Sequence, residues 1–322
     1  MKVLVAPLNW GLGHAARCVP LIERYLETGD EVVLGGDGES LLLLRRHFPH
    51  LRVLPLGALT LRYSSGDSQV GAMLKGLPQI LRSAIKDHRL LRQRLAFEHF
   101  DLVVSDNRFG LFWSDTRCVY ITHQLHIPLP RAYRWLEPCV SALHGLIYRQ
   151  YDEVWVPDYA DMEQCLSGKL GHPHKVYTPH VVYINPLSRF ARIKTSVNTE
   201  EINTNSTYDV VAVLSGLEPQ RSLLEEEVIR RYQHTNKRVL IVEGILHKPP
   251  TVIQKDAITI VPYMDDSVLA KVLLAANKII ARAGYSTIMD FATLDVLHKA
   301  ELIATPGQPE QMYLQDFVHN RL

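Results

Sequence analysis

The chain has 322 residues, enough for two domains of ordinary size, and 47% of them are hydrophobic while 21% are charged, as in a folded globular protein. The formal net charge of +1 excludes a general attraction to nucleic acid, so we expect no nucleic-acid partner. The four cysteines are scattered without a CxxC pair, which argues against a disulfide framework or a metal site and indicates a reducing compartment. We expect a cytoplasmic protein without a membrane-spanning segment, because no run of about 18 apolar residues occurs.

The first half alternates short apolar runs with glycine-containing turns and helical segments. Its Val, Ile and Leu runs are continuous rather than alternating with polar residues, which is typical of parallel strands covered on both faces. The pattern predicts helices at 15–28 and 41–48, and strands at 2–7, 31–34, 51–56, 101–105, 118–122 and 153–156.

The second half repeats this rhythm. A helix is predicted at 221–234, and strands at 209–214, 238–242, 258–261, 278–281 and 301–304. Between the halves, residues 184–208 are rich in Asn, Thr and Ser without a hydrophobic period, which indicates a linker and an exposed loop. We therefore predict an α/β protein with two Rossmann-like, doubly wound parallel-sheet domains that face a central cleft, with an N-terminal domain at 1–185, a linker at 186–207 and a C-terminal domain at 208–322.

A glycine-rich turn follows the first predicted strand. Gly11 and Gly13 allow a tight turn, and His14 then begins a helix at the cleft, where an imidazole can act as a general base. The same residues fit a GxGxxA dinucleotide fingerprint, with Asp37 as the acid for the ribose. A plain turn with an exposed histidine is the third interpretation, and the sequence leaves all three open.

Three turns of the second half have residues suited to a charged or polar ligand. After 209–214, Ser215 and Gly216 precede a helix whose amides can bind a diphosphate, with Arg221 adding charge and Glu218 pointing away. After 278–281, Gly284 precedes a helix with Ser286, Thr287 and, one turn later, Asp290, whose carboxylate can take ribose hydroxyls. After 301–304, a Pro/Gly turn leads to Gln308, Glu310 and Gln311, which suit sugar hydroxyls. Ordinary strand–helix turns would look similar.

Two regions of the first half are candidates for contact with a second substrate. Asp106 and His123 follow predicted strands and lie on the cleft side, where they can assist His14 or form a structural contact. The segment 73–97 predicts a basic amphipathic helix, and 131–151 adds Tyr133, Trp135, Leu143, Leu146 and Tyr148. These faces either pack on the sheet or lie on the inner membrane surface as a peripheral contact.

Taken together, the glycine turn with His14, the turn 215–221, the segment 282–290 and the turn 306–311 resemble the GT-B glycosyltransferases of family 28. This family includes the N-acetylglucosaminyltransferase that acts on the lipid-linked peptidoglycan precursor, and the resemblance covers nearly the whole chain. Residues 184–189 are similar to the segment that joins the two domains of the family. The fold of the family continues with a further helix that crosses back to the N-terminal domain, which we do not find after Tyr313.

The resemblance implies a transferase that moves a hexose from a nucleotide-diphosphate donor, UDP above all, to a sugar or lipid-linked acceptor of the cell envelope, with no cofactor and no metal. His14 would be the base, with Asp106 and His123 as its assistants, and Asp265 and Asp266 would not form a metal-binding pair. Met264 would contact the uracil. The implied donor-binding residues are Ser215, Gly216, Gln220, Arg221, Met264, Arg282, Gly284, Ser286, Thr287, Asp290, Gln308 and Gln311. A UDP-sugar epimerase of the same fold, an NAD-dependent protein and a non-catalytic sugar-nucleotide binder remain the alternatives.

Overall fold

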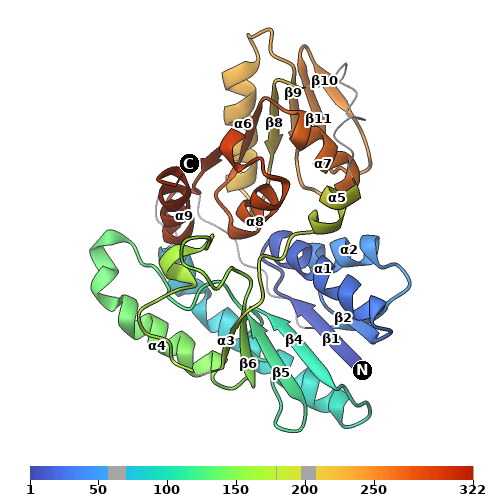
Figure 1. Cartoon of the computed structure of the whole chain (residues 1–322), viewed down its shortest axis with the longest axis vertical. Coiled ribbons are helices and arrows are strands. Elements are labelled where there is room, and N and C mark those ends of the chain that lie inside the picture. The colour runs from blue at the N-terminus through green and yellow to red at the C-terminus, as the bar shows by residue number, and fades with distance from the viewer. Residues whose placement is uncertain (57–69, 179, 197–207, 322) are drawn as a thin grey trace.

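A computed structural model describes residues 1–56, 70–178, 180–196 and 208–321. Figure 1 shows two α/β units stacked along the longest axis, with β1 in the lower unit and β10 near the top of the upper one. The strands of one sheet all precede residue 184, and those of the other all follow residue 209. The predicted fold class, two Rossmann-like parallel-sheet domains, is confirmed.

The first sheet has the order β3-β2-β1-β4-β5-β6-β7, and every neighbouring pair is parallel. Its strands are β1 (Lys2–Pro7), β2 (Glu31–Gly36), β3 (Arg52–Pro55), β4 (Leu102–Asp106), β5 (Arg117–Ile121), β6 (Glu153–Val156) and β7 (Val181–Tyr183). The helices of this domain are α1 (Gly13–Glu27), α2 (Gly38–His47), α3 (Val70–Leu95), α4 (Glu137–Tyr148), and the short 3₁₀ helices η1 (Arg131–Leu136) and η2 (Gly168–Leu170).

The second sheet has the order β10-β11-β9-β8-β12-β13, and only the edge strand β10 runs antiparallel among the pairs described. Its strands are β8 (Val210–Val213), β9 (Val239–Val242), β10 (Ile253–Lys255), β11 (Ile258–Val261), β12 (Lys278–Arg282) and β13 (Ala300–Ile303). Around it lie α6 (Gln220–Tyr232), α7 (Asp266–Ala275), α8 (Tyr285–Leu294), the 3₁₀ helix η5 (Leu297–Lys299) and α9 (Pro309–His319).

Strand β1 shows why the apolar runs are continuous. Val3 and Val5 pack with α1 and α2 on one face of the sheet, whereas Leu4 and Ala6 pack on the other face with residues such as Leu91 of α3. Successive side chains of a strand point to opposite faces, so a strand covered on both sides must be apolar at every position. The same alternation puts Val211 and Ala212 of β8 into different cores of the second domain.

Three elements differ from the sequence-based expectation. Strands β7 and β10 are not predicted, because each has three residues and β10 is exposed and contains Gln254 and Lys255. The expected linker contains a helix, α5 (Ala191–Ser196), which follows Phe190, a residue buried in the core of the second domain. Residues 197–207, the remainder of the expected exposed loop, lie outside the described residues.

Helix α9 joins the two domains. Its Tyr313 hydroxyl accepts a hydrogen bond from the Lys169 amide at 2.9 Å, and the Arg321 guanidinium donates to the Cys165 carbonyl at 2.6 Å. Residues 162–169 belong to the chain of the first domain, so α9 and the residue Arg321 after it contact that domain (Figure 1). Within the described residues, no helix is both long enough and apolar enough to cross a membrane.

Candidate active site

The turns that follow β1, β8 and β12 meet between the two domains. Gly11 and Gly216 have φ angles of 77° and 97°, a left-handed conformation that favours glycine. A Cβ placed on Gly11 would lie 3.8 Å from the Cα of Gly216, so the two glycine turns face each other closely. The carboxyl ends of both parallel sheets thus open toward one place, which is where open α/β sheets bind their ligands.

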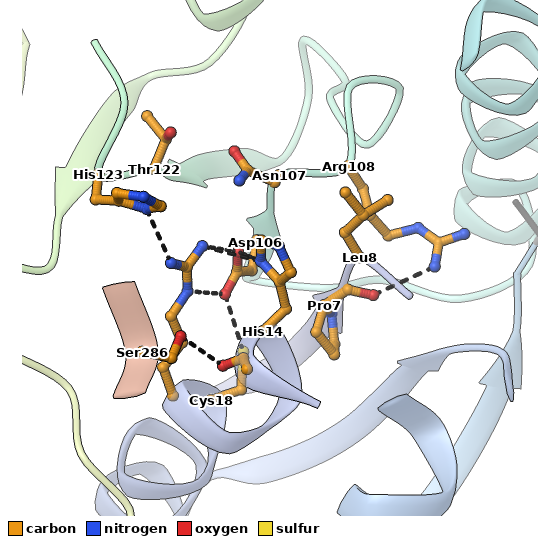
Figure 2. Close-up of polar contacts among 12 residues, drawn as sticks. Pro7, Leu8, His14, Cys18, Asp106, Asn107, Arg108, Thr122, His123 and Ser286 are labelled. Carbon is orange, nitrogen blue, oxygen red and sulfur yellow. Dashed lines mark hydrogen bonds and ion pairs between the residues drawn. The ribbon is translucent and has the colours of Figure 1, made fainter. Parts of the chain in front are cut away.

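His14 and Asp106 form a pair at this place. His14 lies in the first turn of α1, Asp106 ends β4, and the His14 Nδ1 is 2.8 Å from an Asp106 carboxylate oxygen (Figure 2). The Asp106 side chain is fully buried, while that of His14 is 14% exposed. The same Nδ1 also lies 3.0 Å from the Arg17 Nη2, which only donates, so these contacts admit either tautomer of His14. In the tautomer with the proton on Nδ1, that proton is donated to Asp106 and Nε2 is the basic atom. This is the arrangement that a general base needs.

Arg17, one turn after His14, holds the same carboxylate. Its Nε donates to one Asp106 oxygen at 2.5 Å, and its Nη2 donates to the other, which makes a bidentate pair. Burial by itself would raise the pKa of Asp106, but the charges and hydrogen bonds of Arg17 and His14 outweigh it and hold the pKa well below its usual range. Asp106 is therefore ionised whenever the protein is folded at neutral pH.

His123 is close to this pair but is not placed as a second base. Arg17 Nη1 lies 3.2 Å from its Nδ1, and the Glu310 carboxylate lies 2.8 Å from its Nε2 (Figure 2 shows His123 beside the pair). Arginine only donates, so Nδ1 accepts and Nε2 carries the proton toward Glu310. Burial lowers the pKa of His123, although Glu310 acts against this. Both ring nitrogens are engaged with protein groups, so His123 reaches the pair only through Arg17.

The helix α8 brings the second domain against this group. Its Ser286 hydroxyl donates to the Gly13 carbonyl at 3.0 Å, and the ring of Tyr285 stacks on His123 with centroids 4.2 Å apart. Gly284 precedes the helix in an extended conformation, and the contact of Ser286 with Gly13 places the first turn of α8 at the boundary between the domains. The first amides of a helix have no acceptor within the helix. Thr287 is half-buried in the same turn.

Among the residues that the structure describes, two buried polar atoms in this part of the second domain find no hydrogen-bond partner. They are the Nε of Arg282, at the end of β12, and the Oε1 of Gln308, in the turn after the neighbouring strand β13. The two Nη atoms of Arg282 donate to the carbonyls of Ala304 and Gln220 at 3.1 and 2.7 Å. Buried polar atoms without a partner are uncommon, so these two are the natural contacts for a polar ligand.

Other expected donor residues are already engaged with protein groups. Arg221 is paired with Glu218 at 2.8 Å and with Glu225 at 3.2 Å, so both carboxylates already neutralise the charge that was expected to face a phosphate. Gln311 accepts from the Thr305 amide at 2.8 Å. The remaining expected residues are placed as follows: Ser215 is half-buried, Gly216 is exposed, Gln220 is buried, and Met264 packs against the core of the second domain.

Asp290 is also engaged, which corrects the expectation of a free carboxylate for ribose. It accepts from the Ser188 hydroxyl at 2.6 Å and from the Arg189 Nε at 3.3 Å, and Arg189 pairs with Asp266 at 2.9 Å as well. Burial raises the pKa of Asp290 to about 6, against the effect of Arg189. A ribose could take this carboxylate only by displacing Ser188 and Arg189. Asp266 is committed to Arg189, and Asp265 is exposed.

Asp37 bears on the dinucleotide alternative. Its carboxylate accepts from the Arg108 Nη1 at 3.0 Å and from the Asn9 amide at 3.3 Å. Arg108 is buried and makes a further ion pair with Asp87 at 2.8 Å. The acid that would hold the ribose of a dinucleotide is therefore part of a buried charge cluster, which does not favour this alternative.

Asp158, Cys165 and His172 offer donor atoms within 4.8 Å of one another, on the first-domain side of α9. The Asp158 carboxylate accepts from the Leu166 amide at 2.8 Å and the Ser167 amide at 2.9 Å, and His172 lies 3.5 Å from it. The carboxylate thus organises the loop on which α9 packs.

Sequence reasoning missed Arg17, Ser188 and Arg189. The sequence gives only a weak indication that Arg17 belongs to the site. A residue three positions after His14 lies on the same face of a helix. Ser188 and Arg189 reach Asp290 about a hundred positions away, and no local pattern predicts such a contact.

Comparison with known proteins supports the fold. No protein-family model matches the sequence. The chain is 25% identical over 209 residues to an uncharacterized glycosyltransferase of Methanosarcina acetivorans, which covers 59% of the chain and 50% of that protein. The chain therefore spans about half the length of this curated relative.

Solved structures align with nearly the whole chain. UGT2 of Phytolacca americana, solved with UDP-2-fluoroglucose and pterostilbene, has a TM-score of 0.59 at 14% identity and covers 99% of this chain and 83% of its own. A putative UDP-N-acetylglucosamine 2-epimerase of Listeria monocytogenes has a TM-score of 0.56 at 13% identity and covers 100% and 88%. The fold is thus that of the GT-B glycosyltransferases, which an epimerase shares.

Proposed function

We propose that the protein is a glycosyltransferase that moves a sugar from a nucleotide-diphosphate donor, UDP-linked, to the hydroxyl of an acceptor. The observation that carries the proposal is the pair of the partly exposed His14 and the buried Asp106, which lies beside the N-terminus of α8 from the other domain. This transfer requires a base and a group of helix amides on opposite sides of one domain boundary. One side activates the acceptor, and the other receives the leaving diphosphate.

In the proposed reaction, the Nε2 of His14 takes the proton of the acceptor hydroxyl while that oxygen attacks the anomeric carbon of the donor. The bond between the anomeric carbon and the diphosphate oxygen breaks, and the nucleoside diphosphate leaves with the electron pair. Asp106 keeps the Nδ1 proton of His14 in place and stabilises the imidazolium that forms.

The donor would lie along the turns of the second domain. The amides that open α6 and α8 face the diphosphate, and the unpartnered atoms of Arg282 and Gln308 bind donor oxygens. Helix dipoles and donors of this kind can stabilise the leaving group, so we propose a metal-independent hexosyltransferase without a cofactor. Its expected similarity to family 28 is part of the same proposal.

The acceptor would be a sugar or a lipid-linked glycan of the cell envelope, used by a cytoplasmic protein at the inner membrane surface. The first domain exposes Tyr133 and Trp135 on η1, and Leu143 and Leu146 on α4. Helix α3 exposes Leu81 and Ile85 beside Arg82, Lys86 and Arg89, which line a hollow of about 440 Å³. Aromatic and basic side chains of this kind favour contact with an anionic lipid surface.

The test is incubation of the purified protein with a panel of nucleotide sugars, with and without a membrane extract as acceptor source. We expect UDP and UDP-sugars to raise the melting temperature most, and UDP to be released only when an acceptor is present. Isomerisation of UDP-N-acetylglucosamine without an acceptor would instead assign an epimerase. A melting temperature that responds to NAD and not to UDP would overturn the proposal.

A further inference from the structure

Five side chains form a continuous polar chain from one domain to the other. Four of them, His14, Asp106, Arg17 and His123, belong to the first domain, and the last, Glu310, begins α9 of the second. Apart from Glu310 and His14, whose side chains are 22% and 14% exposed, they are buried. Each contact is within hydrogen-bond distance, so a change at Glu310 reaches the pair through two other side chains, His123 and Arg17.

We propose that Glu310 is a positioning residue that fixes the tautomer of His123 and, through Arg17, the carboxylate of the His14–Asp106 pair, so that this pair is fully ordered only when the two domains are closed. The inference rests on the proposed function, because it concerns the regulation of the same site. It assigns to Glu310 a role besides the contact with sugar hydroxyls that the sequence suggested.

The argument starts from the donors and acceptors. Arg17 has only donors, so it can bond to His123 only if the Nδ1 of that ring is bare. The proton of His123 must then be on Nε2, where it needs an acceptor. The Glu310 Oε1 lies 2.8 Å from this nitrogen and supplies that acceptor. Tyr285, stacked on the ring at 4.2 Å, fixes its plane from the second domain as well.

Domain opening would remove both of these contacts at once. His123 would lose the acceptor for Nε2–H, and its proton would be free to occupy Nδ1, where it faces a guanidinium donor. Arg17 would have to turn away, and it is the group that holds both oxygens of Asp106. The closed state therefore keeps the carboxylate in the position in which it orients His14, and the open state releases it.

The first test does not depend on activity. Long-range ¹H–¹⁵N correlation of the histidine side chains reports which nitrogen of His123 carries the proton. We expect the Nε2–H tautomer in the wild type and in Glu310→Gln, whose amide oxygen still accepts, and a shift toward Nδ1–H in Glu310→Ala. The same Nε2–H signal in Glu310→Ala as in the wild type would overturn the proposal.

The second test is a double-mutant cycle on transfer. Glu310→Ala and Arg17→Lys are each expected to lower kcat by about tenfold, and the double variant to lose no more than about threefold beyond the worse single variant. If the fold losses in kcat of the two single variants multiply in the double variant, Glu310 acts only on the donor and the inference is overturned. Glu310→Gln should recover part of the kcat lost in Glu310→Ala.

Glu301→Gln is the matched control, because this carboxylate lies in the same domain but pairs with Arg231 and Lys278 on the surface. Its kcat and its histidine spectrum should equal those of the wild type. A wild type that binds UDP but shows no transfer with any acceptor would defeat the proposed function. An active wild type with multiplying losses would defeat only the role of Glu310.

Discussion

The hydroxyl of Ser286 donates a hydrogen bond of 3.0 Å to the carbonyl of Gly13, although the two residues are 273 positions apart. The bond joins the first turn of α8 to the first turn of α1, one residue before His14. It fixes the distance between the wall that would hold the donor and the wall that carries the base.

Gly13→Ala tests how tightly this distance is set. A Cβ at Gly13 would lie 3.0 Å from the Ser286 Oγ and 3.1 Å from its Cβ, so one of the two helix starts must shift by a few tenths of an ångström. We expect transfer to fall by about tenfold or more, because a small misplacement of reacting groups is costly. Ser286→Ala loses only the hydrogen bond, about 1 kcal/mol of unfolding free energy. Initial rates and urea unfolding of both variants check this, and a Gly13→Ala enzyme as fast as the wild type would contradict it.

His14→Ala separates chemistry from binding. Its imidazole is the proposed base and does not hold the diphosphate, so we expect the thermal shift with UDP to stay and the rate of transfer to fall by about 10²- to 10⁴-fold. The shift is measured first, because it shows that the variant is folded. Wild-type turnover in His14→Ala would remove the base from the mechanism.

Asp106 should give the protein part of its stability at neutral pH. Its folded-state pKa is lowered, so this contribution is present above the unfolded pKa, about 3.9, and is lost as the pH falls below it. Asp106→Asn leaves the Arg17 charge buried without its partner, at a cost of about 3–5 kcal/mol. Urea unfolding from pH 3 to 7 should show this loss at pH 7 and a weaker acid dependence in the variant.

Asp290 should change the pH dependence of the unfolding free energy in the direction opposite to Asp106. Burial raises its pKa to about 6, above the unfolded value, so its contribution is fully present below pH 4 and is lost as the pH rises through 6. Asp290→Asn has no charge to bury and should flatten the stability profile between pH 4 and 6. An unchanged profile in that window would show that the carboxyl titrates normally.

Vesicle binding tests the exposed face of η1 and α4. We expect sedimentation with vesicles that contain anionic phosphatidylglycerol, and a loss of about tenfold in affinity in Trp135→Ser/Leu146→Ser, whose side chains are 74% and 56% exposed. Leu223→Ser, an exposed leucine of the second domain, is the matched control. Equal vesicle binding by the wild type, the double variant and Leu223→Ser would exclude the exposed face of η1 and α4 as the membrane contact.

The sequence allowed the architecture and the position of the pair to be predicted, because both depend on local patterns. Asp106 was expected on the cleft side since it follows a buried apolar run, and His14 since it follows a glycine turn. Their direct contact at 2.8 Å joins residues 92 positions apart. The sequence predicted that Asp106 either assists His14 or forms a structural contact, and it did not decide between the two.

The partners of buried charges could not be predicted. Asp290 was expected to face a ribose because of its place on a helix, yet Arg189 and Ser188 occupy it. Arg221 was expected to face a phosphate, yet Glu218 lies within the same turn and pairs with it. Ion pairs depend on side-chain packing after folding, and a residue type at a helix start does not reveal which charge lies opposite.

Helix α9 has a consequence for synthesis of the protein. Glu310 and the contact of Tyr313 with Lys169 come from the last part of the chain, whereas the residues they meet are made far earlier. On the ribosome, the first domain can therefore fold with His123 still lacking its acceptor. In the proposed mechanism, the histidine–aspartate pair therefore gains its full order only after the segment with Glu310 has been made and has packed against the first domain.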